Sequence, residues 1–195
     1  MLTLGTGVGS GIILKGKVWH GQGMAGELGH VCLVPDGIPC ACGGRGCLER
    51  YASATAIVAR GQEYIRADIG SSILPTETTG PLTTREMARL AVCGHEAMIN
   101  LFDEVGYYLG LGIAAMINAL DLPLYVVGGG VANAWDLFAP AMFRSVREHS
   151  YVYQLSRPTQ TAFHEKSRTF ITKARLGSQA GLLGATFVSV GDDIR

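Results

Sequence analysis

The longest regular pattern of apolar positions runs from Glu96 to Leu120 and predicts a helix. Within it, Leu101, Val105 and Leu109 recur at the spacing of one helical face. Pro123 follows shortly afterwards, and proline is common just past a helix end because it cannot continue the hydrogen-bond ladder. The segment therefore predicts one long, largely buried helix in the middle of the chain.

Short apolar runs bounded by glycine, proline or polar residues predict strands on either side of that helix. The predicted strands are Leu2–Leu4, Leu124–Val127 and Thr169–Ala174, with a hairpin that joins Ile12–Leu14 to Val18–Trp19. Further helices are predicted at Leu48–Asp68, 84–92 (after a Thr83–Glu86 capping-box pattern), Trp135–Ser150 and Ser178–Val190. Strands that come first as a hairpin meander, and then helix alternating with strand, predict an α/β fold with a mixed sheet.

Composition and charge narrow the class of protein. Of the 195 residues, 48% are hydrophobic and 16% are charged, which is typical of a folded globular chain. The formal net charge is zero and no run of lysine or arginine stands out, so we expect no nucleic-acid-binding surface. The most apolar stretch, Tyr107 to Val127, is continuous for about 14 residues, too few to cross a bilayer. Since no secretory signal opens the chain, we expect a cytoplasmic protein with no membrane partner.

Three of the five cysteines, Cys40, Cys42 and Cys47, crowd into eight positions. Cys-x-Cys places two sulfurs on one turn, and three glycines among the four residues before Cys47 let the chain double back. His30 arrives from the other side of the Pro35-Asp36-Gly37 turn. Cysteine thiolate and histidine nitrogen are the ligands of structural zinc, which takes four of them in a tetrahedron. The spacing therefore favours structural Zn²⁺ over a disulfide; the alternative is three unrelated buried thiols and a surface histidine.

Two carboxylates are tethered to this segment. Glu27 lies three residues before His30, and Glu49 lies two residues after Cys47. Sugar hydroxyls require acceptors that are strong and rigidly held, and carboxylates meet the first condition. One ring nitrogen of His30 can bind a metal while the other reaches a ligand. From the residues alone, the pattern is also consistent with two ordinary surface glutamates.

Two glycine clusters are candidate nucleotide-binding turns. Gly5-Thr6-Gly7 ends the first predicted strand, and its backbone N–H groups and the Thr6 hydroxyl can cradle a phosphate. Gly128-Gly129-Gly130 follows a buried strand and precedes a helix, which suits the close approach of a nucleotide. A plain hairpin loop also explains the first cluster, and tight strand-to-helix packing also explains the second.

The motifs around the cysteines resemble those of the ROK family. They are Glu27-Leu28-Gly29-His30, Pro35-Asp36-Gly37 and Cys40-Ala41-Cys42-Gly43-Gly44-Arg45-Gly46-Cys47-Leu48-Glu49. The upstream pattern Leu4-x-x-Gly7-Val8-Gly9-x-Gly11-Ile12 fits the same signature, and the resemblance extends from Leu2 to about Val188. The family groups bacterial glucokinases, fructokinases and N-acetylhexosamine kinases with sugar-responsive repressors. The cysteine motif is highly specific, whereas the glycine motifs alone would not be.

The resemblance implies a fold and a set of residue roles. The fold is an actin-like ATPase (ribonuclease H-like) lobe with a mixed five-stranded sheet, flanking helices and a structural zinc loop at residues 30–47. By similarity, the hexose contacts Glu27, His30 and Glu49, and zinc is held by His30, Cys40, Cys42 and Cys47. The Gly5–Gly7 turn resembles the second phosphate-binding element and Gly128–Gly130 the adenosine-binding element. ATP with Mg²⁺ is then the cosubstrate, and a hexose, with glucose as the first expectation, is the acceptor.

The resemblance also implies that part of the catalytic machinery lies outside this sequence. ROK kinases carry an N-terminal lobe with an Asp-x-Gly-x-Thr-type phosphate loop and an Asn-Asp pair whose aspartate is the general base. We therefore expect residues 1–195 to form the C-terminal large lobe, without the N-terminal lobe and inactive alone. The partial match at Asp68-Ile69-Gly70-Ser71-Ser72 is interpreted as a linker because it follows a predicted helix.

Two further functions are alternatives to a kinase lobe. One is the sugar-sensing effector domain of a ROK transcriptional repressor, and the other is a zinc-stabilised scaffold without a small ligand. Thr6 and the intact Gly128–Gly130 run favour the kinase, since both belong to its nucleotide side. ROK proteins are commonly dimers or tetramers, so a homodimer is the expected assembly.

Overall fold

The computed structural model describes residues 1–67, 82–156 and 168–177. Its strands are β1 (Leu2–Leu4), β2 (Val8–Ser10), β3 (Ile13–Leu14), β4 (Lys17–Val18), β5 (Leu124–Gly128) and β6 (Phe170–Lys173). Its helices are α1 (Glu49–Ala52), α2 (Ala54–Ala67), α3 (Thr84–Val92), α4 (Glu96–Leu120), α5 (Trp135–His149) and α6 (Tyr151–Ser156), with 3₁₀ segments η1 (Leu28–His30) and η2 (Gly130–Ala134). The helix predicted at 178–190 and the segment 68–72 lie outside the described residues.

The main sheet is mixed, as the sequence predicts, and has the strand order β2-β1-β5-β6. The β1–β2 pair is antiparallel, whereas β5 runs parallel to both β1 and β6. A five-stranded sheet is expected, whereas the main sheet has four strands in the part of the chain that the structure describes. The predicted hairpin pairs β3 with β4 in a sheet of its own, so these strands do not extend the main sheet.

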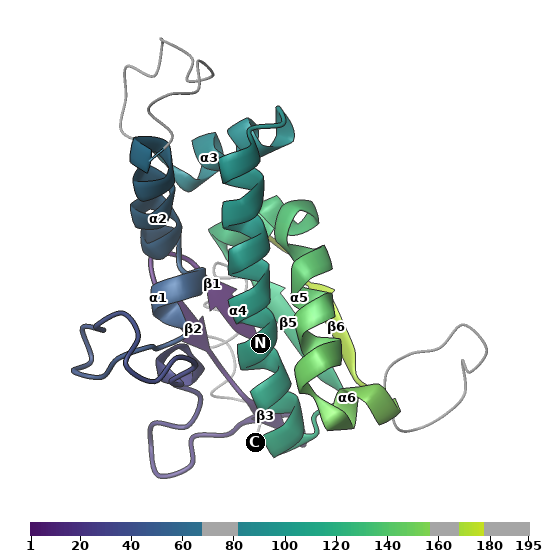
Figure 1. The fold of residues 1–195 in the computed structure, drawn as a ribbon. Helices are drawn as coiled ribbons and strands as arrows, with labels where there is room; N and C mark the ends of the chain where they lie inside the picture. The colour runs from purple at the N-terminus through teal and green to yellow at the C-terminus, as the bar shows by residue number, and fades with distance from the viewer. Residues whose placement is uncertain (68–81, 157–167, 178–195) are drawn as a thin grey trace.

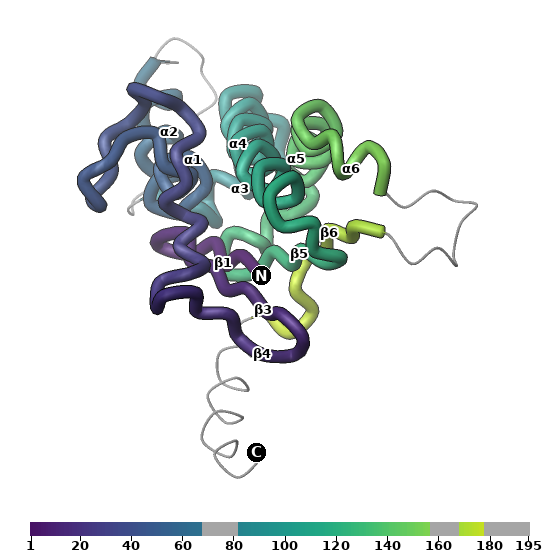
Figure 2. Tube along the Cα trace, turned by 90° about the horizontal axis from the view of Figure 1, so that it is seen from below, coloured from purple at the N-terminus to yellow at the C-terminus, as the bar shows by residue number. Residues whose placement is uncertain are grey.

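The helices form a layer on one face of the main sheet. Figure 1 shows α4 and α5 side by side in front of β5 and β6, and Figure 2 shows the helices on one side of the strands. Gly106 and Gly110 of α4 let the two helices approach closely, because a Cβ at Gly106 would overlap the Phe138 carbonyl oxygen of α5. The core between the layers contains fully buried residues from both: Leu2, Leu4, Phe102, Leu109, Ile113, Ile117, Val127 and Phe138.

The predicted central helix is confirmed as α4 over Glu96–Leu120. It ends where Asp121 adopts the left-handed conformation, two residues before Pro123. The predicted cap of α3 is also confirmed, since the Thr83 side chain accepts a hydrogen bond from the Glu86 N–H at 3.2 Å. In the described ranges, all helices are too short or too polar to traverse a lipid bilayer.

The helical segment predicted at Leu48–Asp68 forms two helices, α1 and α2, because the helix breaks at Ser53. Ser53 has an extended backbone, with φ −78° and ψ 159°, and separates α1 from α2. Its hydroxyl accepts a hydrogen bond from the Ala56 N–H at 3.1 Å, so Ser53 acts as the N-cap of α2. The break matters for the site, because it leaves Glu49 on a short helix tied to the cysteine loop.

Candidate functional site

Residues 30–47 fold into a compact segment, the cysteine loop, whose two limbs are joined by backbone hydrogen bonds. Leu33 N–H donates to the Gly46 carbonyl at 2.8 Å, and Gly46 N–H donates to the Ile38 carbonyl at 2.9 Å. At the tip, Cys40 N–H donates to the Gly44 carbonyl at 2.8 Å. These bonds fix the positions of the cysteines without help from a regular helix or sheet.

Gly46 is the position where this loop requires glycine. Its φ is +68°, and a Cβ there would overlap the carbonyl oxygen of Val34 on the opposite limb. The turn sends the next residue, Cys47, inward, where it is 2% exposed. Leu48 then packs against Gly112 of α4, so the loop is attached to the central helix.

The structure brings together the four residues that the sequence singles out as metal ligands. The donor atoms of His30, Cys40, Cys42 and Cys47 all lie within 4.8 Å of one another. Cys42 Sγ is 3.7 Å from Cys47 Sγ, and Cys40 Sγ is 3.7 Å from His30 Nδ1. Zinc–sulfur bonds of about 2.3 Å in a tetrahedron place two sulfurs about 3.8 Å apart. The cluster therefore offers the donor set of a structural zinc site, and two of its donor separations are close to those expected around zinc.

Two thiols of this cluster, Cys42 and Cys47, have pKa values shifted in opposite directions. The Gly44 backbone and then the neighbouring thiols lower the pKa of Cys42 by hydrogen bonding. Burial, followed by the neighbouring thiols, raises the pKa of Cys47 to about 12. Crowded sulfurs resist ionising together, whereas a coordinated cation holds thiols in their deprotonated form. The donor chemistry thus fits a metal ion. Four protein ligands would leave no coordination position of that ion open for a catalytic water.

Glu49 links this cluster to the first glycine turn. Its Oε2 accepts a hydrogen bond from the Val8 N–H of β2 at 2.9 Å. A Cβ at Gly7 would overlap that same oxygen, so glycine at this position makes the contact possible. Oε1 has no hydrogen-bond partner among the described residues and remains available to a ligand.

Glu27 immediately precedes η1 and His30 is its last residue, and η1 packs against the same strand. Gly29 of η1 lies so close to Val8 that a Cβ there would overlap the Val8 carbonyl oxygen. Leu48 N–H donates to the Val31 carbonyl at 3.0 Å, which joins the end of η1 to the start of α1. The three predicted sugar-binding side chains are therefore all carried on short elements fixed to one another through β2 and the cysteine loop.

The two glycine clusters meet at the carboxyl ends of the parallel strands β1 and β5. A pocket of about 610 Å³ lies at this edge of the sheet. Gly5, Thr6 and Gly130 line it, whereas Gly7, Gly128 and Gly129 do not. Gly7 instead contacts Glu49, and Gly129, with φ +90°, passes so close to Leu4 that a Cβ would overlap its carbonyl oxygen.

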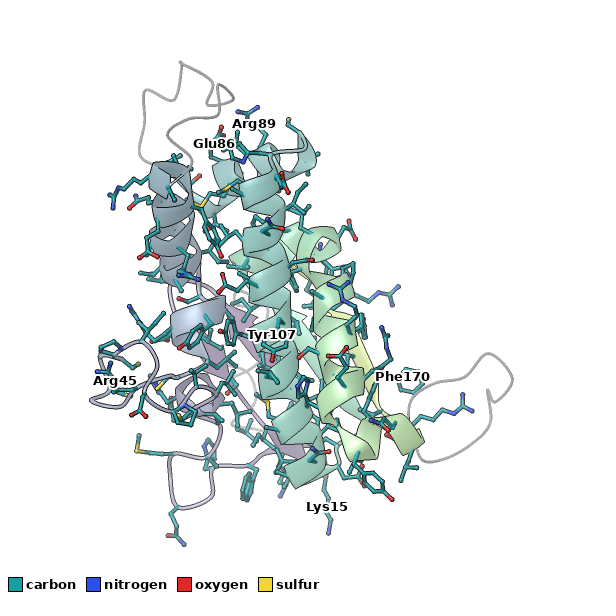
Figure 3. The ribbon with its side chains drawn as sticks, viewed as in Figure 1. Lys15, Arg45, Glu86, Arg89, Tyr107 and Phe170 are labelled. Atoms are coloured by element: carbon teal, nitrogen blue, oxygen red, sulfur yellow. The ribbon has the colours of Figure 1, made fainter. Side chains whose placement is uncertain are left out.

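Several residues that line the pocket were not anticipated as site residues. Thr83, Thr84 and Arg85 come from the N-terminus of α3, and Asn133 comes from η2. The capping pattern at Thr83 predicts a helix start, but only the tertiary fold places that start beside Gly5. Arg85 forms no ion pair among the described residues, whereas Arg89 on the same helix is paired with Glu86 at 2.6 Å (Figure 3).

Comparison with known proteins places this geometry in a family. The sequence model of the ROK family matches residues 1–190. The chain belongs to the ROK family. It is 37% identical over 187 residues to the glucokinase of Halalkalibacterium halodurans, covering 94% of this chain and 53% of the relative.

Two solved ROK structures are similar to the chain. A Streptomyces griseus ROK family glucokinase, solved with glucose and AMPPNP, has a TM-score of 0.74 at 29% identity, covering 96% of this chain and 58% of that one. A ROK family transcriptional regulator, a homologue of the E. coli MLC protein, has a TM-score of 0.78 at 29% identity, covering 97% and 44%. The mixed sheet with its helices therefore adopts the actin-like ATPase fold of ROK sugar kinases. The chain spans about half the length of the relatives that it matches.

Proposed function

We propose that this chain forms the hexose-binding lobe of an ATP-dependent hexose kinase, with glucose as the acceptor. Glucokinase relatives support the reaction class, and one of them was solved with glucose and AMPPNP. One observation carries the proposal: Glu49 Oε2 is bound to Val8 N–H, in the strand that follows the Gly5–Gly7 turn. That bond ties a candidate sugar carboxylate to the edge of the pocket where a nucleotide would lie.

In this proposal the carboxylates of Glu27 and Glu49 accept hydrogen bonds from the sugar hydroxyls, and the Nε2–H of His30 donates one to a sugar oxygen. The proposed zinc ion is held by His30, Cys40, Cys42 and Cys47, and its part is to fix the loop that carries these groups. Nδ1 of His30 faces Cys40, so Nε2 is the ring nitrogen left for the sugar. Because binding requires acceptors that are already in place, loop rigidity translates into hexose affinity.

The pocket beside Gly5, Thr6 and Gly130 would take the nucleotide. Bound Mg²⁺ would neutralise phosphate charge during phosphoryl transfer. From this chain, the α3 N-terminus and the guanidinium of Arg85 supply positive potential at the pocket, and Thr6 supplies a hydroxyl. Gly129 contributes indirectly, because its positive φ and its close approach to Leu4 let the chain turn beside β1, and Gly128 contributes by packing closely against Met1 and Ala174.

Hexose binding is tested by calorimetry with the zinc-loaded chain. Glucose should bind, and Glu27→Gln and Glu49→Gln should each weaken binding about tenfold or more, because each removes a charged acceptor. Glu148→Gln is the matched control, since Glu148 is exposed on α5 away from these contacts. Equal glucose affinity in all four proteins would contradict the assignment of the two carboxylates.

Nucleotide binding is tested with AMPPNP and Mg²⁺. Arg85→Ala should weaken binding about tenfold, because it removes a charged donor from the pocket. Arg89→Ala on the same helix should leave it unchanged, since that guanidinium is engaged by Glu86. Equal effects of the two substitutions would overturn the role of Arg85.

We further propose that residues 1–195 alone do not phosphorylate glucose. The sequence contains no Asn-Asp pair of the kind that supplies the general base in ROK kinases. Incubation with glucose, ATP and Mg²⁺ should give no glucose 6-phosphate above background. Robust turnover by this chain would contradict the proposal.

The effector domain of a sugar-responsive repressor is the second candidate. The similarity to the ROK transcriptional regulator favours it, with a TM-score of 0.78. A repressor domain of this kind would bind the sugar but not AMPPNP, whereas the kinase lobe would bind both.

We propose that the chain forms a homodimer in either case. Sedimentation equilibrium measures this oligomeric state directly.

A further inference from the structure

The backbone at Glu27 forms an inverse γ-turn. Its φ is −72° and its ψ is 50°, and the Leu28 N–H donates to the Gly26 carbonyl at 2.7 Å. Glu27 is the central residue of this turn, and its exposed carboxylate has no hydrogen bond or ion pair within the described ranges. The backbone turn therefore determines the position of the Glu27 carboxylate.

Ser10, the last residue of β2, bonds to both ends of that turn. Its hydroxyl donates to the Gly26 carbonyl and accepts from the Leu28 N–H, the latter at 3.2 Å. These are the groups immediately before and after Glu27. The turn also lies directly on the strand, since a Cβ at Gly26 would be 3.3 Å from the Ser10 carbonyl oxygen.

Two residues of β2, Val8 and Ser10, therefore contact the side chain of one candidate sugar carboxylate and the backbone beside the other. Val8 N–H binds the Glu49 side chain itself, and Ser10 binds the backbone on either side of Glu27. We propose that Ser10 is a positioning residue of the hexose site, which acts by holding the γ-turn that presents Glu27. This inference rests on the proposed role of Glu27 in binding hexose.

The physical consequence concerns the cost of ordering. A three-residue turn closed by one hydrogen bond has little stability of its own, so without the Ser10 hydroxyl the backbone at Glu27 would be less ordered before sugar binds. That ordering cost would then be subtracted from the binding free energy. Zinc binding would not change, because the Ser10 hydroxyl bonds only to the backbone of Gly26 and Leu28 within the described residues and to no candidate metal ligand.

The test compares three zinc-loaded proteins by glucose calorimetry: wild type, Ser10→Ala and Ser10→Thr, with zinc content measured for each. Ser10→Ala should raise the Kd for glucose about tenfold while zinc content stays at wild-type level. Ser10→Thr keeps the hydroxyl and should stay within about threefold of wild type. If Ser10 had only a structural role, Ser10→Ala would lower the melting temperature but would not raise the Kd for glucose more than Ser10→Thr does.

The outcomes separate the inference from the function on which it rests. If wild type binds no hexose, the proposed function fails. If wild type binds glucose but Ser10→Ala binds within twofold of it, or if Ser10→Thr loses as much as Ser10→Ala, the inference fails. Hydrogen exchange on the wild-type chain gives a second measurement that needs no variant. Glucose should slow exchange of the Leu28 amide, and an unchanged rate at saturating glucose would contradict the proposal.

Discussion

Gly43 and Gly46 form a matched pair for testing how the cysteine loop is held. Both have positive φ, +91° and +68°, and both lie between Cys42 and Cys47. An added Cβ at Gly43 meets nothing within 4 Å, whereas at Gly46 it overlaps the Val34 carbonyl oxygen. Alanine therefore introduces backbone strain at both positions but a collision at Gly46 alone.

The two substitutions should differ in magnitude. Left-handed backbone costs a non-glycine residue about 1–2 kcal/mol, which is the whole cost expected for Gly43→Ala. In Gly46→Ala the collision also pushes apart the limbs joined by Leu33 N–H to Gly46 and by Gly46 N–H to Ile38. Each bond contributes about 1 kcal/mol, so Gly46→Ala should cost about 3–4 kcal/mol.

The assay is urea denaturation of the zinc-loaded variants, with zinc retention followed against a colorimetric chelator. Gly43→Ala should keep its zinc, and Gly46→Ala should lose it more readily because Cys47 follows the displaced residue. Equal destabilisation by the two substitutions, or wild-type zinc retention in Gly46→Ala, would contradict the role of the Gly46 turn in placing Cys47.

Three further predictions concern the metal, the helix layer and the tyrosine at α2. Stripping zinc with a chelator should lower the melting temperature by several degrees and adding zinc should restore it, because metal binding is coupled to folding; an unchanged melting curve would count against the site. Gly106→Ala should destabilise by about 3 kcal/mol through its collision with the Phe138 carbonyl, as measured by denaturation, and a cost under about 1 kcal/mol would show that α4 and α5 can separate freely. Burial and the hydrogen bond to Glu104 raise the pKa of Tyr64 above 10, so the folded state keeps its proton while the unfolded chain loses it. Stability should therefore fall as pH rises above about 10, and less steeply in Tyr64→Phe; identical slopes would contradict the shift.

Elements with strong local signals could be predicted from the sequence. The α4 helix matches its predicted limits because its apolar repeat is long and Pro123 closes it. The break at Ser53 and the short α6 helix after Ser150 were missed. In both places a serine hydroxyl caps the following helix, with Ser150 Oγ accepting from Tyr153 N–H at 3.0 Å. A lone serine is a weak signal, because serine is also common inside helices and in loops.

The candidate site divides in the same way. The proximity of His30 to the three cysteines could be predicted because these four residues lie within eighteen residues of one another, from His30 to Cys47. Arg85 could not, since its place beside Gly5 depends on how α3 packs against the rest of the fold. The hydrogen bonds from Ser10 to the backbone on either side of Glu27 also join segments that are far apart along the chain. Nothing in the intervening sequence predicts them.

We propose that the cysteine loop, closed on zinc, holds the carboxylates that bind the sugar. Glucose calorimetry on one preparation, first zinc-loaded, then stripped by a chelator, then reloaded, tests this claim most directly. Glucose should bind to the zinc-loaded protein, binding should be lost when zinc is stripped, and it should return on reloading. Glucose affinity that is the same in all three states would contradict it.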